Sequence, residues 1–354
     1  MSVDQVSQRF TINRSGHWLI LLCCICFCLG IGFNTYLAFD QFKNPDSVTY
    51  LNTANGHFRD QSPVRRYRVV VPWLAQAYAK VVLRNTETDP EYTLTNPYKN
   101  NKLLKGFFHI NALLMAVAAW LIFRICIRQG ASGPAAVLAV AFMLCGSQWG
   151  GLFIGHPFTD SLYMLVIAAT VWGLQSRSNT WLALGCLLGF VAKESFILFI
   201  PFILLAATGR RGKAVLWLAA GIGLLCVLHW SIDRGLGVPV TEAIRADAGH
   251  LQAITQSLGI LFSGNGLRLL LTVFGPVSLL PLILLLQQPY RLQLKQQGNG
   301  LHLLFLFTIL AHALLSTELY RMFYFSAPVI IPLLAISFDY LARRYRLFGT
   351  DAAA

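Results

Sequence analysis

The chain has 354 residues, and 28 Lys and Arg against 15 Asp and Glu give it a formal net charge of +13. Hydrophobic residues make up 56% of the chain and charged residues 12%, whereas soluble domains carry about 25% charged residues. This composition argues against a soluble enzyme. Apolar runs of about 20 residues, the length that crosses a bilayer core, recur along the chain. They predict an all-α, polytopic transmembrane helical bundle in one integral membrane domain, residues 1–354.

About ten apolar segments are predicted to span the membrane. They cover residues 17–39, 105–127, 134–153, 160–175, 180–192, 195–208, 214–232, 267–287, 300–316 and 321–341. If the N-terminus is cytoplasmic, every short cytoplasmic loop is basic, as the positive-inside rule requires. Both chain ends are then expected inside, and residues 40–104 and 233–266 form two external loops.

The first external loop contains an amphipathic stretch, Val64–Arg84. It mixes basic side chains with Val, Trp and Leu, and Pro72 is expected to start or kink a helix there. Such a helix lies in the interface between lipid and water, so the loop is predicted to rest on the outer leaflet. In the second external loop, a short helix is predicted within Val240–Leu261.

Two of the apolar segments, Trp181–Ala192 and Ser195–Thr208, are too short to cross a bilayer alone. Lys193 and Glu194 separate them. A re-entrant or tilted pair fits this pattern, because irregular backbone at membrane depth is tolerated only beside protein or a water-filled cavity. A cavity is therefore predicted near these two residues.

Three carboxylates are candidates for chemistry on the external side: Asp46, Asp160 and Glu194. Asp46 follows the first span, with Tyr50 one helical turn later, and could act as a general base. The alternative for both aspartates is a helix N-cap. For Glu194 the alternative is a structural ion pair with its neighbour, Lys193.

A complementary set of cations could hold phosphate oxygens, Arg by bidentate hydrogen bonds and Lys as a point charge. The set comprises Arg65, Arg66, Arg68, Lys193 and Arg321, which follows Glu318. For Arg65 and Arg66 the alternative is attraction to anionic lipid headgroups, and this is the favoured interpretation. Nucleic acid is not an expected partner, because no basic stripe or zinc-finger spacing occurs outside the spans.

Cofactor signals are weak. The carboxylates of Glu87, Asp89 and Glu91 could hold a divalent cation, but a solvated loop is the better interpretation, since Ca²⁺ needs six to eight oxygens. The eight cysteines lie in or beside apolar runs, which favours small buried hydrophobes over a metal site. Histidines inside spans, among them His312, are interpreted as core residues. No P-loop, GxSxG or HExxH motif occurs.

The layout resembles the GT-C superfamily of membrane glycosyltransferases. The resemblance covers most of the chain as a pattern, through an early external acidic residue, an entry segment to the fourth span, a short helix pair and a late Arg-containing segment. These correspond to Asp46 (less well Asp40), His156–Asp160, Gly185–Pro201 around Ala192–Ser195, and Glu318–Arg321 followed by Pro328 and Pro332. The first loop lacks the DxD pair of that superfamily.

The resemblance implies inverting transfer of a sugar from a polyprenyl-phosphate-linked donor to a glycan, lipid or protein acceptor, on the periplasmic face of a bacterial inner membrane. Asp46 would be the base, with Asp160 and Glu194 as further catalytic carboxylates. The substrate-binding set would be Arg66, Arg68, Lys193, Arg321, His156, Tyr50 and Glu318. Two alternatives stay open: a secondary transporter with an ionisable site at the Lys193–Glu194 break, and a polysaccharide polymerase or ligase using the same donor class.

Overall fold

The computed structural model describes residues 14–40, 43–59, 61, 63–84, 102–237, 250–295, 300–316 and 318–345, and all regular structure in these ranges is helical. The predicted all-α class is thereby confirmed. The first helices are α2 (Arg14–Ala38), α3 (Pro45–Ala54), α4 (Pro63–Arg66), α5 (Val70–Val81), α7 (Lys102–Arg128), α8 (Gly133–Cys145), α9 (Gln148–Gly155) and α10 (Asp160–Gln175). They are followed by α11 (Asn179–Ala192), the 3-10 helix η2 (Glu194–Phe199), α12 (Ile200–Ala206), α13 (Arg211–Leu236), α15 (His250–Leu261) and α16 (Gly264–Phe274). The last are η4 (Pro276–Leu279), α17 (Leu280–Leu284), α18 (Gln288–Lys295), α19 (Gly300–Leu314), α20 (Leu319–Tyr324) and α21 (Ala327–Arg344).

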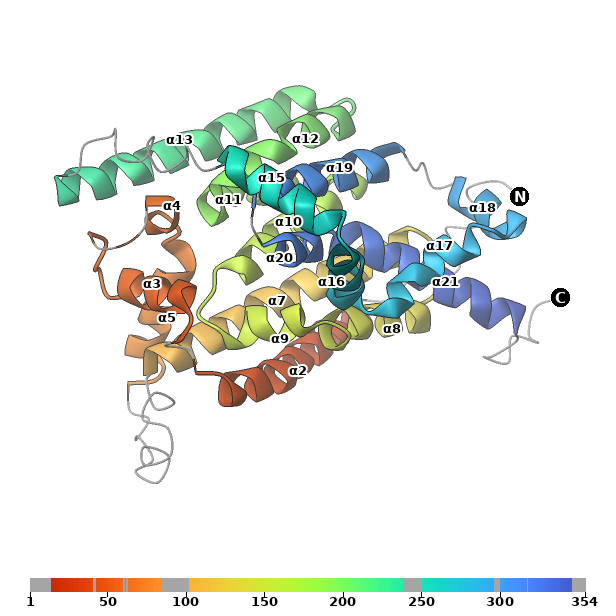
Figure 1. The fold of residues 1–354 in the computed structure, drawn as a ribbon, viewed down its shortest axis with the longest axis horizontal. Coiled ribbons are helices and arrows are strands. Elements are labelled where there is room, and N and C mark those ends of the chain that lie inside the picture. Colours follow the sequence, from red (N-terminus) through yellow and green to blue (C-terminus); the bar gives the residue numbers. More distant parts are fainter. Residues whose placement is uncertain are drawn as a thin grey trace.

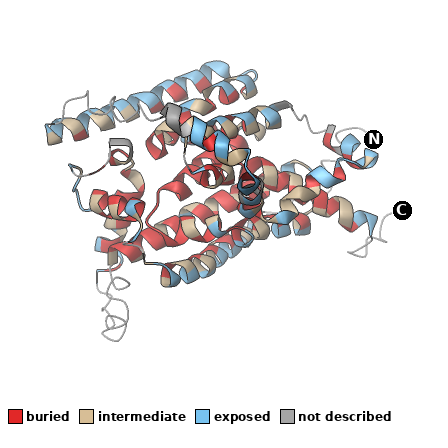
Figure 2. Ribbon diagram, in the orientation of Figure 1, coloured by how far each residue is buried: buried red, intermediate tan, exposed pale blue. Residues whose placement is uncertain are grey.

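The core is built around α7, which packs against α2, α5, α10 and α21. In the most apolar 18-residue stretch of α7, 61% of the residues are buried. In the corresponding stretches of α2 and α13, only 17% and 11% of the residues are buried. Figure 2 shows the same contrast, with α7 and α10 mostly buried and α13 largely exposed. The exposed side chains of α13 include Leu216, Val227 and Trp230. Apolar faces left open in this way are suited to lipid rather than to water.

Three helices among the described residues, α2, α7 and α13, are long and apolar enough to cross a membrane, or up to five spans if two bent helix pairs each count as one. The prediction of ten spans is therefore wrong in number, although each predicted apolar segment coincides with helix. The reason is that several of the predicted spans are too short to cross a bilayer and others are interrupted. Helices of 14 to 16 residues, such as α10, α11 and α19, extend about 21–24 Å, short of a core of roughly 30 Å.

Other predicted spans are interrupted. Helices α8 and α9 meet at 68°, because Gly146 ends the first and Ser147 caps the second by accepting a hydrogen bond from Trp149 N. The predicted segment 267–287 is interrupted at Gly275, which follows α16 and precedes η4 and α17. The φ of this residue is 70°, a backbone conformation that favours glycine. Helix α21 carries Asp339, Arg343 and Arg344 within its 18 residues. These breaks turn long apolar runs into short packed helices.

The predicted first external loop contains α3, α4 and α5, which lie at one end of the molecule (Figure 1). Helix α5 begins at Val70, two residues before Pro72, and buries Val71, Ala75 and Ala79 while Trp73 stays exposed. It lies close to α7, where a Cβ on Gly106 would be 2.5 Å from the carbonyl oxygen of Ala75. The amphipathic helix predicted here thus exists and packs on the core helix.

The segment predicted as a second external loop, residues 233–266, begins within a helix, because α13 continues through Asp233 and ends at Leu236. Gly237, with a φ of 65°, provides the left-handed cap that stops it. The predicted short helix is represented by α15, and residues 238–249 lie outside the described residues. In Figure 1 the start of α13 points away from α3–α5, and the end of α21 lies at the opposite end of the molecule. The basic turn before α13 and the arginines of α21 therefore lie away from the predicted external loop.

Candidate functional site

Asp46 lies in the first turn of α3, and its side chain points to two arginines. Asn44 caps this helix, since its side chain accepts hydrogen bonds from the backbone N–H groups of Asp46 and Ser47. Asp46 therefore has no capping role, and its carboxylate is used elsewhere. Oδ1 lies 2.6 Å from Nη2 of Arg65, and Oδ2 accepts a hydrogen bond from Nη1 of Arg321 at 2.9 Å.

Asp160 opens α10 and is held in place by a buried asparagine of α7. Asn111 donates to the carbonyl oxygens of His156 and Phe158, at 2.9 and 3.0 Å, and accepts a hydrogen bond from Ser161. These bonds fix the chain that enters α10, where Thr159 makes no side-chain cap. The Asp160 carboxylate consequently turns to Arg321 and accepts a hydrogen bond from its Nη2.

Arg321 joins three carboxylates that lie far apart in the sequence. It comes from the short helix α20 and contacts Asp46, Asp160 and Glu318, while its guanidinium lies 4.8 Å from the ring centre of Phe158. Its side chain is 6% exposed. The Nε atom has no hydrogen-bond partner among the described residues. A buried arginine with this many acidic partners fixes the positions of α3 and α10 relative to α20.

Lys193 lies at the break between α11 and η2, in an extended conformation with φ −162° and ψ 126°. Within the described part of the chain its nearest carboxylate oxygen belongs to Asp160, at 4.0 Å. The ammonium otherwise donates to Sδ of Met322 and faces the rings of Tyr163 and Phe325 at about 5.5 Å. Burial lowers the pKa of Lys193 to about 7. The local pair with Glu194 that the sequence left open is not formed.

Glu194 instead pairs with Arg68 of the first external loop. It accepts hydrogen bonds from Nη2 and Nε of Arg68 at 3.1 and 3.3 Å. Nη1 of the same arginine donates to the hydroxyl of Tyr50 at 3.2 Å. Burial would lower the pKa of Arg68, but Glu194 and Tyr50 outweigh it and hold that pKa above its ordinary value. The break between α11 and η2 and the segment between α4 and α5 are therefore joined by one ion pair.

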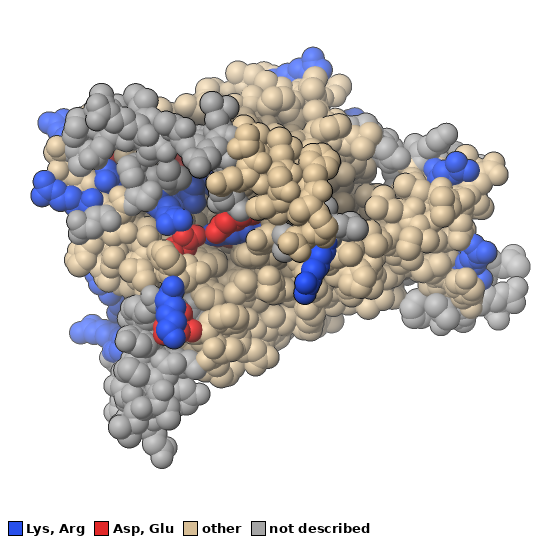
Figure 3. Space-filling model, viewed as in Figure 1, with Lys and Arg blue, Asp and Glu red and all other residues tan. Residues whose placement is uncertain are grey.

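These groups form one charge cluster, which we define by its eight members. They are Asp46, Arg65, Arg68, Asp160, Lys193, Glu194, Glu318 and Arg321. Six of them are joined by ion pairs, and the Arg68–Glu194 pair joins them through the electrostatic effect of Arg68 on Asp160 and Lys193. The cations and carboxylates are equal in number. The side chains of Arg65, Glu194 and Glu318 are 35%, 29% and 47% exposed, so the cluster opens to the surface on their side. Figure 3 shows acidic and basic atoms side by side in a hollow of one face. The enclosed cavity predicted beside Lys193 stays a prediction.

Most residues of the predicted site meet in this cluster, but Arg66 and His156 do not join its ion pairs. Arg66 turns toward Asp233 of α13, at 3.8 Å, and donates to the carbonyl oxygen of Gln61. His156 is buried beside the rings of Phe39 and Phe158, and its ring nitrogens have no hydrogen-bond partner among the described residues. Burial and the nearby Arg321 lower the pKa of His156 to about 4, so the ring is neutral at physiological pH.

Arg66 belongs to a second charged group, which we call the α13 clamp and define as Arg66, Tyr67, His229 and Asp233. The hydroxyl of Tyr67 donates to Asp233 at 2.7 Å, and its ring stacks on that of His229 at 3.5 Å. Burial, assisted by the hydrogen bond to Asp233, raises the pKa of Tyr67 to about 12. The clamp fastens the segment after α4 to α13.

The sequence analysis named Arg65 among the candidate cations but favoured a lipid contact for it, and it did not identify a polar group next to the break at Lys193. In that group, Ser195 Oγ lies 2.8 Å from Nε2 of His312, whose Nδ1 is 3.4 Å from the Tyr163 hydroxyl. Helical spacing offered no signal for Arg65, because α4 ends at Arg66 and Arg68 lies beyond it. Nothing in the sequence placed His312 beside the break, since its helix lies more than 100 residues later.

No group of three or more His, Cys, Asp or Glu residues with the spacing of a metal site occurs in the described ranges. The predicted alternative at Glu87, Asp89 and Glu91 lies outside the described residues. All eight cysteines are free, and four of them are buried, as their interpretation as small buried hydrophobes predicts: Cys24, Cys28, Cys126 and Cys186. The other four, Cys23, Cys26, Cys145 and Cys226, are exposed.

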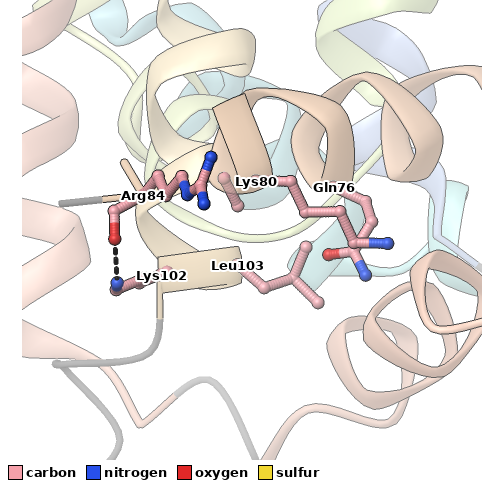
Figure 4. Close-up of a pocket in the computed structure, with 6 residues that line it drawn as sticks. Gln76, Lys80, Arg84, Lys102 and Leu103 are labelled. Atoms are coloured by element: carbon pink, nitrogen blue, oxygen red, sulfur yellow. Dashed lines mark hydrogen bonds between the residues drawn. The ribbon is translucent and has the colours of Figure 1, made fainter. Parts of the chain in front are cut away.

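A separate hollow of about 370 Å³ lies between the end of α5 and the start of α7. Figure 4 shows the basic side chains along it, with Lys102 donating to the carbonyl oxygen of Arg84 at 2.8 Å. Its lining residues are Gln76, Ala79, Lys80, Arg84, Lys102 and Leu103. None of them belongs to the charge cluster, so this hollow is distinct from the candidate site.

In comparisons with known proteins, no family model, no curated protein and no solved structure matches this chain.

Proposed function

We propose that this protein is a membrane glycosyltransferase that moves a sugar from a polyprenyl-phosphate-linked donor to an acceptor hydroxyl on the external face. The observation that carries the proposal is the meeting of Asp46, the predicted base, with Arg68, Lys193 and Arg321, the predicted phosphate ligands, in one half-open cluster. These residues come from four separate parts of the chain. A merely structural network has no need of so many cations beside a surface opening.

The surroundings of the Lys193 ammonium are evidence in favour of an anionic ligand. It is 9% exposed, and a charge removed from water in this way is costly unless an opposite charge compensates it. Asp160 does so only at 4.0 Å and is shared with Arg321. A thioether and two aromatic rings occupy the remaining side of the ammonium. A phosphate oxygen would supply the close partner that the ammonium lacks.

The position of the cluster suits a lipid-linked donor. The loop that contributes Asp46, Arg65 and Arg68 continues into α5, whose exposed side chains include Trp73, Leu74 and Val81. Such an apolar face rests at the lipid interface. A polyprenyl tail could then stay in the bilayer while its phosphate reaches the cluster, which confines the donor to the site without a soluble binding domain.

The proposed reaction is a single displacement. Asp46 takes the proton of the acceptor hydroxyl, and the acceptor oxygen forms a bond to the anomeric carbon of the sugar. The bond between that carbon and the phosphate oxygen breaks, and its electron pair leaves on the phosphate. Lys193, Arg68 and Arg321 stabilise the negative charge that develops there. The products are the glycosylated acceptor and the polyprenyl phosphate, and Asp46 returns its proton to water.

The test is transfer of labelled sugar from a panel of polyprenyl-phosphate sugars by the protein in nanodiscs, with a membrane extract as acceptor. We expect Asp46→Asn to lower the rate by about 100-fold or more, the usual contribution of a general base. Asp40→Asn is the comparison variant, because Asp40 is the second aspartate that the resemblance allows as base and it pairs with the exposed Lys43. A wild-type rate in Asp40→Asn together with the loss in Asp46→Asn would assign the base to Asp46. Equal rates in Asp46→Asn and wild type would contradict the assignment of the base.

A secondary transporter is the second candidate, favoured by one observation. The structure contains helix breaks at 68° between α8 and α9 and at 81° between α15 and α16, besides the break at Lys193. Transporters place ionisable residues at such interruptions. Donor-independent proton flux in proteoliposomes that is lost in Lys193→Met, with no sugar transfer by any variant, would favour this candidate over the first.

A further inference from the structure

The two oxygens of Asp46 are both engaged by cations. Arg65 holds Oδ1 at 2.6 Å, and Arg321 holds Oδ2 at 2.9 Å. The carboxylate has further lone-pair sites, but Asp46 is only 8% exposed, so the two arginines cover most of the space from which an acceptor hydroxyl could approach it. Displacement of one arginine would open an oxygen of Asp46 to the acceptor.

The two arginines differ in how firmly they are held. Arg321 has a side chain 6% exposed and contacts two further carboxylates, those of Asp160 and Glu318. Arg65 has a side chain 35% exposed, comes from the four-residue helix α4, and has Asp46 as its only ion-pair partner among the described residues. Moving Arg321 would leave Asp160 buried without its closest cation. Moving Arg65 breaks a single, partly solvated pair.

An incoming phosphate also needs cations that the resting cluster does not offer freely. Its carboxylates and cations balance, so the phosphate must compete with a carboxylate for its partner. Lys193 lacks a close carboxylate and is available to a phosphate. Among the other cations, Arg65 can be separated from its carboxylate at the lowest cost in free energy, because its only pair among the described residues, with Asp46, is partly solvated. Because Arg65 lies at the open side of the cluster, it is also the arginine that a ligand meets from the surface.

We infer that Arg65 is an exchangeable lock on Asp46: the donor phosphate takes Arg65, and this exchange releases Oδ1 of Asp46 to accept the acceptor proton. The inference rests on the proposed function and adds an order of events to it. Asp46 becomes a base only when a donor phosphate is in place. Arg65 acts through Asp46 and the phosphate, and the proton balance of the transfer is unchanged.

The exchange is tested by binding rather than by turnover. Farnesyl phosphate is titrated into the protein in phosphatidylcholine nanodiscs, with farnesol as the control that lacks a phosphate. We expect Arg65→Gln to raise the Kd about tenfold, the effect of one partly screened charge pair. Asp46→Asn should lower the Kd about tenfold, since it leaves Arg65 free for the phosphate.

The double variant separates this mechanism from simple repulsion between Asp46 and the phosphate. If the gain in Asp46→Asn comes through Arg65, it should shrink to less than about threefold when measured in the Arg65→Gln background. If the full gain persists there, repulsion explains it and the lock is overturned. If Asp46→Asn binds no tighter than wild type, the lock is overturned as well.

Failure of the proposed function gives a different result. Wild-type protein that binds farnesyl phosphate no better than farnesol would contradict a phosphate site altogether, and the exchange with it. If wild-type protein binds farnesyl phosphate, but Asp46→Asn tightens the binding equally with and without Arg65, the lock is overturned. The glycosyltransferase proposal would then still stand. Thermal unfolding of each variant in the same nanodiscs shows whether it is folded.

Discussion

The four consecutive residues Arg65 to Arg68 serve two charged groups that differ in kind. Arg65 and Arg68 enter the charge cluster, whereas Arg66 and Tyr67 enter the α13 clamp. The division follows from a turn after α4, which ends at Arg66: the backbone N–H of Arg68 donates to the carbonyl oxygen of Arg65 at 3.2 Å, and this bond holds the two cluster arginines close in the chain. Within one turn of chain, the same residue type therefore has two different tasks.

The clamp is covered, and the cluster opens to the surface. In the clamp, a single carboxylate, that of Asp233, accepts the Tyr67 hydroxyl bond and lies near Arg66, and stacked rings cover the contact. Buried nitrogens without a hydrogen-bond partner among the described residues occur in both groups: Nε of Arg66 and Nε2 of His229 in the clamp, and Nε of Arg321 in the cluster. The cluster differs because Lys193 is buried without a close carboxylate, beside an opening formed by partly exposed side chains. A poorly compensated charge beside a surface opening favours a place for a ligand.

The comparison is tested most severely by Arg321→Gln. The change leaves Asp160 buried and without its closest cation, so we expect a loss of about 3–5 kcal/mol in the stability of the folded state. Lys43→Gln removes the exposed pair with Asp40, which should be worth less than about 1 kcal/mol. Thermal unfolding of both variants in detergent measures the difference. Similar melting temperatures would show that the cluster is solvated and does not hold α3, α10 and α20 together.

A smaller effect is expected from pH through Lys193. Burial, opposed by Asp160 and assisted by Arg68, lowers the pKa of this lysine to about 7. A phosphate binds the protonated form, so affinity should be high below pH 7 and fall as pH rises through that value. Between pH 6 and pH 8 the Kd of a polyprenyl-phosphate sugar, a diester without its own titration there, should rise about tenfold.

Lys193→Arg provides the control for this pH dependence. A guanidinium stays protonated over the whole range, so the variant should bind with a Kd that changes less than about twofold between pH 6 and pH 8. An unchanged slope in Lys193→Arg would assign the titration to another group and remove Lys193 from the phosphate site.

The sequence was sufficient for the helices and for most of the cluster, since apolar runs fix where helices form and charges inside or beside them are costly. Asp46, Asp160, Lys193 and Arg321 could all be selected on that ground. The number of spans could not be predicted, because hydropathy does not register the bends at Gly146 and Gly275 that divide the runs.

The pairing inside the cluster was also beyond the sequence. Lys193 and Glu194 are neighbours, yet they bind Asp160 and Arg68, because an extended backbone at Lys193 sends the two side chains in different directions. Arg65 and Arg66 are indistinguishable in composition, and only the three-dimensional position of Asp233 decides which of them leaves the site. The Glu194–Arg68 and Arg66–Asp233 pairs join residues more than 100 positions apart, and no local pattern in the sequence predicts them.

The smallest expected effect comes from a substitution in the α13 clamp rather than in the charge cluster. Tyr67→Phe removes the hydroxyl that donates to Asp233 but keeps the ring on His229, so it should lower stability by about 1 kcal/mol. Farnesyl phosphate binding should change less than about twofold, because Arg68 keeps its bonds to Glu194. Tyr345→Phe, at an exposed tyrosine, is the control for stability. If Tyr67→Phe weakened phosphate binding as strongly as Arg65→Gln, the clamp would have to position the cluster, and the two groups would form one functional unit.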